Sequence, residues 1–434
     1  MAAAGDGVVR PRPQPPAHRR SISGSADMKC RHCAAPLTDV FVDLGSAPPS
    51  NAFLRTEDLP RPELHFPLKV YTCVECQLVQ VDEVQRHDAL FSDDYVYFSS
   101  YSSSWLAHAR RYVDQVVDRL ALGADSLVME IASNDGYLLQ YVRSRGIGCV
   151  GIEPTASTAA VARGLGIESI ESFFGAGFAR QFVAERRQAD LVLGNNVLAH
   201  VPDINDFVAG LREVLAPAGT ITVEFPHLLQ LVEQGQFDTV YHEHFSYLSL
   251  HTVQRIFASQ GLTVWDVEEL PTHGGSLRVW AQHAAHPRAP TGAVAALLRK
   301  EADAGMTGMD FYRRLQPVAE RIKNDLLSFL IEQRRAGKSV VGYGAAAKGN
   351  TLLNYAGVRG DLLAYVVDAS PHKQGRFLPG SRIPVVAEAE LRRQRPDFVI
   401  VLPWNLRDEI GEQLAYIGDW GGRLVTVVPQ LRIG

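Results

Sequence analysis

Residues 127–155 read "LVMEIASNDGYLLQYVRSRGIGCVGIEPT", in which two short apolar runs flank a segment with helical spacing. Two further apolar runs follow, "LVLGNNV" from residue 191 and "TITVEF" from residue 220, again separated by helix-like stretches. Short apolar runs joined by helical crossovers are typical of the buried strands of a parallel α/β sheet. We therefore expect such a sheet, with its ligand at the carboxyl ends of the strands.

The first strand leads into the turn "EIASNDG", and the second strand ends at Glu153. An acidic side chain at that second position can accept hydrogen bonds from a ribose, which indicates an adenosine-type cofactor. A dinucleotide fold would need G-x-G-x-x-G in the turn, but Ala132 and Asn134 stand where glycines are required. S-adenosylmethionine has no phosphates and needs less close approach. We expect it to be bound by Glu130, Asn134, Asp135, Gly136 and Glu153.

Two adjacent β-rich runs, 262–270 and 276–284, are linked by "PTHGG" and predict a hairpin at the edge of this sheet. A terminal hairpin separates methyltransferase sheets from simple dinucleotide folds. A plain Rossmann dehydrogenase is the second interpretation of this region.

Four cysteines form two C-x-x-C pairs, Cys30 with Cys33 and Cys73 with Cys76. Two such pairs complete a tetrahedral structural zinc site. Because protein thiolates fill all four positions, the zinc leaves no open site for a substrate. The alternative is a set of reduced structural thiols.

Composition restricts the class of protein further. Hydrophobic residues make up 46% of the 434 residues, and 43 basic against 48 acidic residues leave a net charge of -5. This balance gives no electrostatic footprint for nucleic acid, and no apolar run approaches the roughly 20 residues needed to cross a bilayer. Residues 1–27 contain Pro and Arg where a signal peptide needs an apolar stretch. We expect a disordered tail or an expression leader there, and a cytoplasmic monomer.

The last third of the chain predicts a long helix over 310–335 and then a second doubly wound pattern. Its first turn holds Gly342, Gly344 and Ala347, which is similar to a dinucleotide fingerprint, and Asp368 ends the next strand. The candidate contacts to phosphate or sugar are Lys348 and Asn350, with structural packing as the alternative.

A series of motifs occurs in one order from about residue 30 to the C-terminus: "CRHC…CVEC", "FSDDYVYFSSYSSSWLAHA", "EIASNDGYLL", "GIEPT", "NNVLAHVPD", "YHEHFSYLS", "HGGSLRVW" and "GYGAAAKGN". Together they resemble the sugar C-methyltransferases of deoxysugar biosynthesis. The resemblance implies an α/β enzyme with a zinc-binding domain (28–90), a central class I S-adenosylmethionine-dependent methyltransferase fold (91–290) and a Rossmann-like domain that helps to bind the sugar nucleotide (291–434).

It also implies the reaction, which is methylation of a ring carbon of a dTDP-linked 4-ketosugar. Carbon 3 is favoured over carbon 5, and the tyrosine-rich and histidine motifs are closest to members acting on a 3-amino-4-ketosugar. The substrate expected on this basis is dTDP-3-amino-2,3,6-trideoxy-4-keto-D-glucose.

A carbon nucleophile arises when a base removes the proton beside the ketone, and histidine can do so near neutral pH. In "YHEHF" the resemblance assigns His244 as the base, with Glu243 in support and Tyr241 as a donor to the enolate. If this loop is extended, Tyr241 and Glu243 point one way and His242 and His244 the other. A His-x-His metal site and a structural loop are the alternatives.

The same resemblance assigns His200 and Tyr95 to the active site, with Tyr97 and Tyr101 as close alternatives to Tyr95. The remaining candidates are Asn195 and Asn196 for the cofactor and His273 for the substrate. Two other functions stay open, a nicotinamide-dependent sugar-nucleotide oxidoreductase and a zinc-bearing adaptor that binds nucleotides without turnover.

Overall fold

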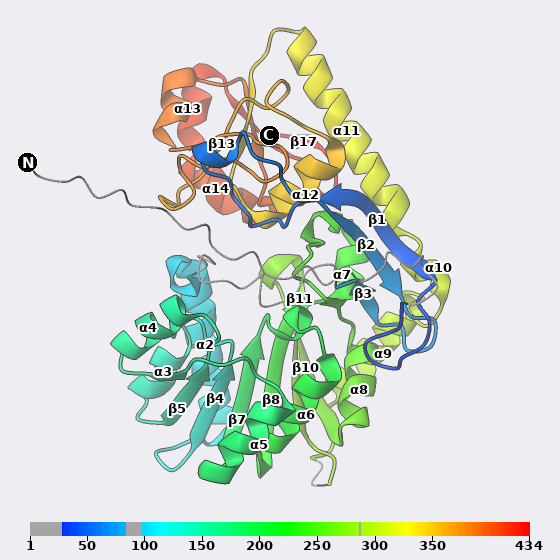
Figure 1. The fold of residues 1–434 in the computed structure, drawn as a ribbon, viewed down its shortest axis with the longest axis vertical. Helices are drawn as coiled ribbons and strands as arrows, with labels where there is room; N and C mark the ends of the chain where they lie inside the picture. The colour runs from blue at the N-terminus through cyan, green and yellow to red at the C-terminus, as the bar shows by residue number, and fades with distance from the viewer. Residues whose placement is uncertain (1–27, 84–97, 286–287) are drawn as a thin grey trace, which may run out of the picture.

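The computed structural model describes residues 28–83, 98–285 and 288–434, arranged as three sheets. Figure 1 shows the C-terminal sheet above the central one, with the N-terminal strands and the long helix α11 along one side. The predicted disordered tail, 1–27, lies outside the described residues, and so do Tyr95 and Tyr97. No helix in the described ranges is long and apolar enough to cross a membrane.

The central sheet has seven strands in the order β10-β11-β8-β7-β4-β5-β6. Six of them run in the same direction, and β11 is antiparallel to both of its neighbours, which confirms the predicted hairpin at the sheet edge. Counted along the chain, this order is 3-2-1-4-5-7-6 read from β6. The bounds are β4 (Leu127–Ile131), β5 (Gly148–Ile152), β6 (Glu168–Ile170), β7 (Ala189–Asn195), β8 (Leu215–Pro226), β10 (Leu262–Leu270) and β11 (Ser276–His283).

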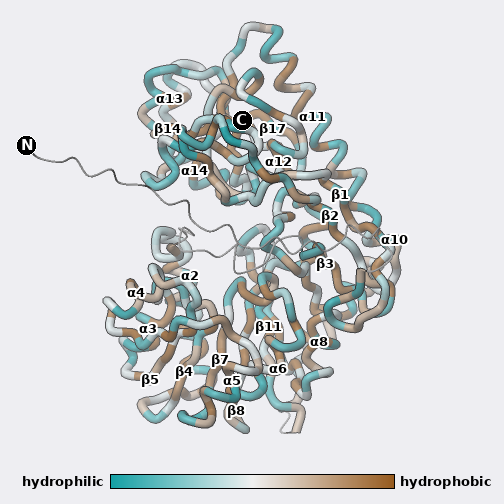
Figure 2. The backbone as a smooth tube through the Cα atoms, viewed as in Figure 1, coloured by the Kyte–Doolittle hydropathy of each residue, from teal (hydrophilic) through white to brown (hydrophobic). Residues whose placement is uncertain are grey.

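Helices cover both faces of the central sheet because neighbouring strand residues point to opposite sides. Val128 packs with the helices of one face, whereas Met129 packs with those of the other. The first face holds α2 (Ser103–Leu120) and α3 (Leu139–Ser144), and the second holds α5 (Ala176–Glu185), α6 (Ile204–Val214) and α8 (Leu250–Ser259). Figure 2 shows the strands of this sheet as mostly hydrophobic runs.

Side chains also fix where several of these helices begin. Ser102, Asp203 and Ser249 accept hydrogen bonds from the backbone N–H groups at the starts of α2, α6 and α8. Asp203 follows the segment that carries His200, and Ser249 follows the segment that carries His244. These caps therefore help to fix the points at which the two segments enter α6 and α8.

The N-terminal sheet is antiparallel, in the order β1-β2-β3-β9. Its first strands are β1 (Asp39–Ala47), β2 (Phe66–Thr72) and β3 (Val79–Val81). The fourth strand, β9 (Ser246–Tyr247), comes from the segment that directly follows the histidine motif and pairs with β3. The zinc-binding region and the histidine motif therefore share one sheet.

The C-terminal sheet has the order β14-β13-β12-β15-β16-β17, in which the first five strands are parallel and β17 is antiparallel. Counted along the chain this order is 3-2-1-4-5-6, the Rossmann arrangement that was predicted. The strands are β12 (Val340–Tyr343), β13 (Val366–Val367), β14 (Val385–Val386), β15 (Phe398–Val401), β16 (Arg423–Thr426) and β17 (Arg432–Ile433). The helices are α12 (Ala347–Ala356), α13 (Ala389–Gln394) and α14 (Arg407–Gln413).

The single long helix expected over 310–335 is two helices, α10 (Met309–Tyr312) and α11 (Leu315–Arg335). Pro317 lies in the first turn of α11, where a backbone N–H has no partner within the helix in any case. Helix α11 packs against β1 and α12 and so joins the N-terminal and C-terminal sheets. The other α-helices of the described residues are α4 (Ala156–Gly164), α7 (Leu228–Glu233) and α9 (Gly292–Asp303).

Candidate active site

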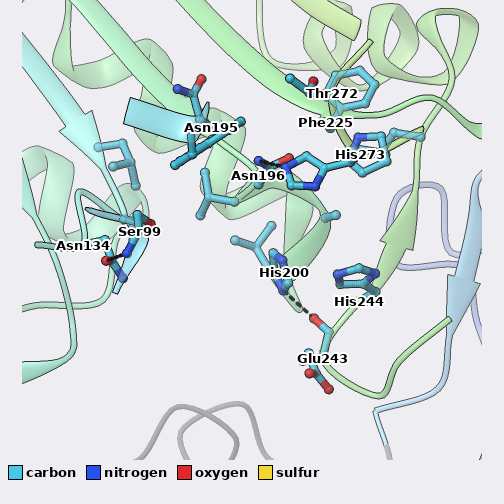
Figure 3. A pocket seen from close by; sticks show the side chains of 18 of the residues that line it. Ser99, Asn134, Asn195, Asn196, His200, Phe225, Glu243, His244, Thr272 and His273 are labelled. Carbon is cyan, nitrogen blue, oxygen red and sulfur yellow. Dashed lines mark hydrogen bonds between the residues drawn. The ribbon is translucent and has the colours of Figure 1, made fainter. Parts of the chain in front are cut away.

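All three sheets contribute to one cavity of about 1410 Å³. Its walls include the carboxyl ends of β4, β5, β7 and β8, Asn51 of the N-terminal region, and the turns after β12 and β15. Pockets for one small ligand usually hold about 300–1,000 Å³. The cavity is therefore large enough for two reactants, and part of it appears in Figure 3.

The turn after β4 has the backbone conformation of a glycine-rich loop, although only one of its three residues with positive φ is a glycine. Ala132, Asn134 and Gly136 all have positive φ, at 56°, 50° and 78°. The backbone N–H groups of Asn134 and Thr155 donate to the two carboxylate oxygens of Glu153, at 2.9 and 2.8 Å. Asn134 and Glu153 both line the cavity, where the sequence predicted the cofactor.

Three other residues predicted to bind the cofactor lie behind this wall rather than on it. Glu130 is fully buried, which raises its pKa well above the usual carboxyl range, and Asp135 accepts a hydrogen bond from the Ser100 N–H. A Cβ at Gly136 would lie 2.6 Å from the Ile167 side chain. These residues shape the turn, and any contribution to cofactor binding through it stays a prediction.

Asn195 and Asn196 line the cavity at the end of β7. Asn195 donates to the Tyr137 hydroxyl at 3.3 Å, and Asn196 donates to Nε2 of His273 at 3.2 Å (Figure 3). Asn196 and His273 each have a φ of 54°, which is unfavourable for residues other than glycine. Strain of this kind is often found at ligand sites, and His273 lines the cavity wall.

His200 and His244 come from separate segments and meet in the cavity, with ring centroids 4.6 Å apart (Figure 3). Nδ1 of His244 lies 3.0 Å from the carbonyl of Thr239, and Nδ1 of His200 lies 2.9 Å from the carbonyl of Glu243. A carbonyl only accepts, so each Nδ1 must carry the proton. Nε2 of His244 therefore holds a lone pair.

Burial keeps both of these imidazoles uncharged. It lowers the pKa of His200 to about 4 and the pKa of His244 well below its usual value. The neighbouring His200 lowers the pKa of His244 further, because two adjacent imidazolium ions would repel each other. At neutral pH both rings are therefore uncharged, and His244 is in the form that can accept a proton.

The histidine motif is a turn, so the extended loop on which the predicted alternation depended is not formed. The backbone N–H of His244 donates to the carbonyl of Tyr241 at 3.2 Å. Tyr241, Glu243 and His244 all line the cavity, whereas His242 faces Phe66 of β2. A hydrogen bond across four residues reverses the chain direction, and this breaks the two-residue period of a strand.

Glu243 does not hold the ring of His244. Its Oε1 accepts from Ser50 and Asn51 of the N-terminal region, at 3.1 and 2.9 Å, and burial raises its pKa. Burial also raises the pKa of Tyr241 well above the usual range, so the hydroxyl of Tyr241 stays protonated and can donate.

The residues predicted to bind substrate are only partly brought together. Lys348 lines the cavity, donates to Asn405 and lies over the ring of Trp404. Asn350 instead donates to the carbonyl of Ser50 and does not line the cavity. Tyr101 is 69% exposed and stacks with His372 of the C-terminal region, also off the cavity wall.

The four predicted zinc ligands form one cluster, with their sulfur atoms within 4.8 Å of one another. The Sγ atoms of Cys30 and Cys76 lie 3.5 Å apart, and those of Cys33 and Cys73 lie 3.4 Å apart. A disulfide would need about 2.05 Å, whereas four thiolates on one zinc ion are separated by about 3.8 Å. The spacing and the chemistry of the sulfurs fit a structural zinc ion.

Four cavity residues had no individual signal in the sequence: Trp105 and His108 of α2, Thr239, and Arg278 of β11. Arg278 and His108 meet at the carboxylate of Glu224 beside the cavity, at 2.7 and 2.9 Å. These residues are far apart in the chain, and only the three-residue spacing of Trp105 and His108 on one helix face was visible in advance.

Three features define an S-adenosylmethionine-dependent methyltransferase. They are the strand order of the central sheet, the cavity at the carboxyl ends of its strands, and the carboxylate at the end of its second strand. Family models match a zinc binding domain at residues 30–91, a methyltransferase domain at 105–267 and a C-methyltransferase C-terminal domain at 271–429. The C-methyltransferase NovU of Streptomyces niveus is 36% identical over 405 residues, which cover 93% of this chain and 96% of NovU. The chain therefore belongs to the C-methyltransferase family, as its motifs predicted.

Solved structures also resemble the chain. One is the PH0226 protein from Pyrococcus horikoshii OT3, with 16% identity over 43% of this chain and 94% of that chain and a TM-score of 0.36. Another is magnesium protoporphyrin IX methyltransferase from Synechocystis PCC 6803 with bound S-adenosylmethionine, with 15% identity over 45% and 88% and a TM-score of 0.31. The classification follows from the family models and the sheet order.

Proposed function

We propose that this enzyme methylates a ring carbon of a dTDP-linked 4-keto deoxysugar during biosynthesis of a branched sugar. Carbon 3 is the favoured position, and dTDP-3-amino-2,3,6-trideoxy-4-keto-D-glucose is the favoured substrate. The observation that carries the proposal is the neutral His244, which lines a cavity large enough for a cofactor and a second ligand and keeps a lone pair on Nε2 because Nδ1 is bound to Thr239.

His244 accepts the proton beside the ketone at Nε2, because Nδ1 is already protonated and bound to Thr239. Tyr241, on the same wall, donates to the oxygen of the enolate that forms. When bound, S-adenosylmethionine supplies the electrophilic methyl group. Asn134, Glu153, Asn195 and Asn196 are the cavity residues that would hold it beside the nucleophilic carbon.

The C-terminal region supplies cations to the cavity wall. Lys348 and Lys373 line the cavity near the start of α12, where a diphosphate would be attracted. Lys348 is thus proposed to bind the nucleotide part of the substrate, with His273 near the sugar. Roles for Tyr95, Tyr97, Tyr101 and Asn350 remain predictions, as do the cytoplasmic location and the monomeric state.

The alternatives receive less support. Membership in the C-methyltransferase family leaves the nicotinamide-dependent oxidoreductase without support. Within the described ranges, the four cysteines are the only cluster with ligand atoms close enough for a metal ion, so proton transfer is favoured for the histidine motif.

The test incubates the enzyme with S-adenosylmethionine labelled in its methyl group and a panel of dTDP-ketosugars that differ at carbons 3 and 5. We expect one labelled sugar with one additional methyl group. The variant His244→Asn should bind S-adenosylmethionine normally and transfer no methyl group. Full transfer by this variant would remove His244 from the mechanism, and no transfer by wild type to any ketosugar would refute the proposed substrate class.

A further inference from the structure

Arg31 lies between two predicted zinc ligands, Cys30 and Cys33, and its side chain points away from the sulfur cluster toward the histidine segments. Its guanidinium contacts two neighbouring segments, one at Pro202 and the other at Val81 and Phe245. Gln80 of β3 fixes the approach, because its Oε1 accepts from the backbone N–H and from Nε of Arg31, at 2.9 and 3.3 Å. Gln80 also donates to Sγ of Cys30 at 3.2 Å. Gln80 therefore fixes the orientation of the Arg31 side chain relative to the cysteines of the metal-binding turn.

The first contact is with the segment that carries His200. Nη1 of Arg31 donates to the carbonyl of Pro202 at 3.1 Å. Asn205, three residues further along, strengthens this attachment by donating to the carbonyls of Arg31 and His32, at 3.3 and 2.9 Å. The metal-binding turn thus holds the chain on the C-terminal side of His200.

The second contact is with the segment that carries His244. The Cζ atom of Arg31 lies 5.3 Å from the ring centroid of Phe245, the residue that follows His244. Nη2 of Arg31 donates to the carbonyl of Val81, and the backbone N–H of Val81 donates to the carbonyl of Phe245 at 3.2 Å. Arg31 therefore holds the ring and, through Val81, the backbone of Phe245.

We propose that Arg31 is a positioning residue that sets the distance and orientation between the imidazoles of His200 and His244. This inference rests on the proposed function, because it gives the zinc-binding turn a part in proton transfer. One planar cation reaches Pro202, Val81 and Phe245 together, which a lysine ammonium on a single flexible stem cannot do. Displacement of reacting groups by about 1 Å can reduce a rate about 100-fold.

The experiment uses the full-length, zinc-loaded enzyme and the variants Arg31→Met, Arg31→Lys and Arg31→Ala. The matched control is Arg61→Met, since Arg61 also belongs to the N-terminal region but pairs with Asp58 at the surface. We expect Arg31→Met to lower kcat about 10- to 100-fold. Zinc content and the Kd of S-adenosylmethionine should stay at wild-type values, and Arg61→Met should match wild type throughout.

Two further readouts separate positioning from a general loss of structure. The first is exchange of the proton beside the ketone in deuterium oxide, with S-adenosylhomocysteine in place of the methyl donor, and it should slow by the same factor as kcat. The second is rescue, since added guanidinium ion should restore part of the kcat of Arg31→Ala while methylammonium should not. If Arg31→Met loses zinc, Arg31→Lys takes its place in the exchange experiment. We expect Arg31→Lys to keep its zinc and to exchange the proton more slowly than wild type.

The inference is overturned if Arg31→Met and Arg31→Lys hold zinc and exchange the proton at the wild-type rate. It is equally overturned if activity falls only in proportion to lost zinc and guanidinium rescues nothing. Failure of the proposed function looks different, because wild type itself would then neither exchange the proton nor transfer a methyl group.

Discussion

The histidine that we propose as the base is uncharged because it is buried, and this sets its response to acid. Burial lowers the pKa of His244 well below the ordinary value near 6.5, so a proton binds to Nε2 only in more acidic solution. The base form therefore persists as the pH falls through 6.5. We predict that kcat/KM stays level between about pH 8 and pH 6.5. A decline that begins at or above pH 6.5, with the protein still folded, would contradict this prediction.

The turn after β4 offers a pair of opposite substitutions. Ala132→Gly should relieve an unfavourable positive φ and raise the free energy of unfolding by up to about 1 kcal/mol. Gly136→Ala should lower it by about 1–3 kcal/mol, since the new methyl group would meet Ile167 and Ala162. Urea unfolding measures both changes. Calorimetric titration should find S-adenosylmethionine binding retained in Ala132→Gly, and equal stability of the two variants would refute this explanation.

For single residues, the sequence predicted which side chains lie at the active site better than it predicted which residues those side chains contact. His200, His244 and Tyr241 were expected at the active site, and the structure brings all three to one cavity. The partners of Glu243 are Ser50 and Asn51, about 190 residues earlier in the chain. No local pattern encodes a contact over that distance, so the sequence could not show which residues the carboxylate of Glu243 contacts.

Among the elements, the strands of the two parallel sheets could be predicted because a buried strand is a continuous apolar run. The strand β9 could not, since two residues are too few to show a period and their partner β3 lies more than 160 positions away. The division between α10 and α11 was also missed, because the apolar spacing continues through the break and Pro317 is acceptable in a first helical turn.

The segment before His244 is held by elements of the C-terminal region, which leads to a third prediction. Nε1 of Trp404 donates to the buried carboxylate of Asp238 at 2.8 Å, and Asp238 precedes Thr239, whose carbonyl holds His244. Trp404→Phe removes this donor. We expect the free energy of unfolding to fall by about 1–3 kcal/mol, with a lower kcat in the labelled-methyl assay.

The matched control for Trp404→Phe is Trp420→Phe. Trp420 donates to the carbonyl of Pro396 at 3.0 Å in the same region, and it does not line the cavity. Loss of this hydrogen bond should lower the free energy of unfolding without changing kcat. If both variants keep wild-type kcat, the C-terminal region does not position the base.

Considered as a whole molecule, the three sheets converge on the segment from Asp238 to Tyr247. The N-terminal sheet pairs with it through β9, the C-terminal region contacts it through Trp404, and the central sheet contacts it through His200. The sequence predicted the order of the three regions and the zinc ligands. It could not predict this convergence, because the contacts join residues that are each unremarkable in their local pattern.

Removal of zinc should therefore affect more than the region that binds it. A chelator strong enough to strip the four cysteines should loosen β3 and, with it, β9 and the position of His244. We expect methyl transfer to be lost while S-adenosylmethionine binds the central sheet with a Kd changed by less than about threefold. Metal analysis, the labelled-methyl assay and calorimetric titration measure these effects, and added zinc should restore transfer. Full activity of the metal-free enzyme would refute this coupling.

Strand β9 also limits how such enzymes can be recombined. A hybrid gene joined between residues 83 and 98 would combine a β3 from one parent with a β9 from the other. The two strands pair Val79 with Tyr247 and Gln80 with Ser246, so a mismatch there would shift the histidine turn of the recipient. Hybrids meant to alter sugar preference should therefore transfer the zinc-binding strands and residues 241–247 as one inherited unit.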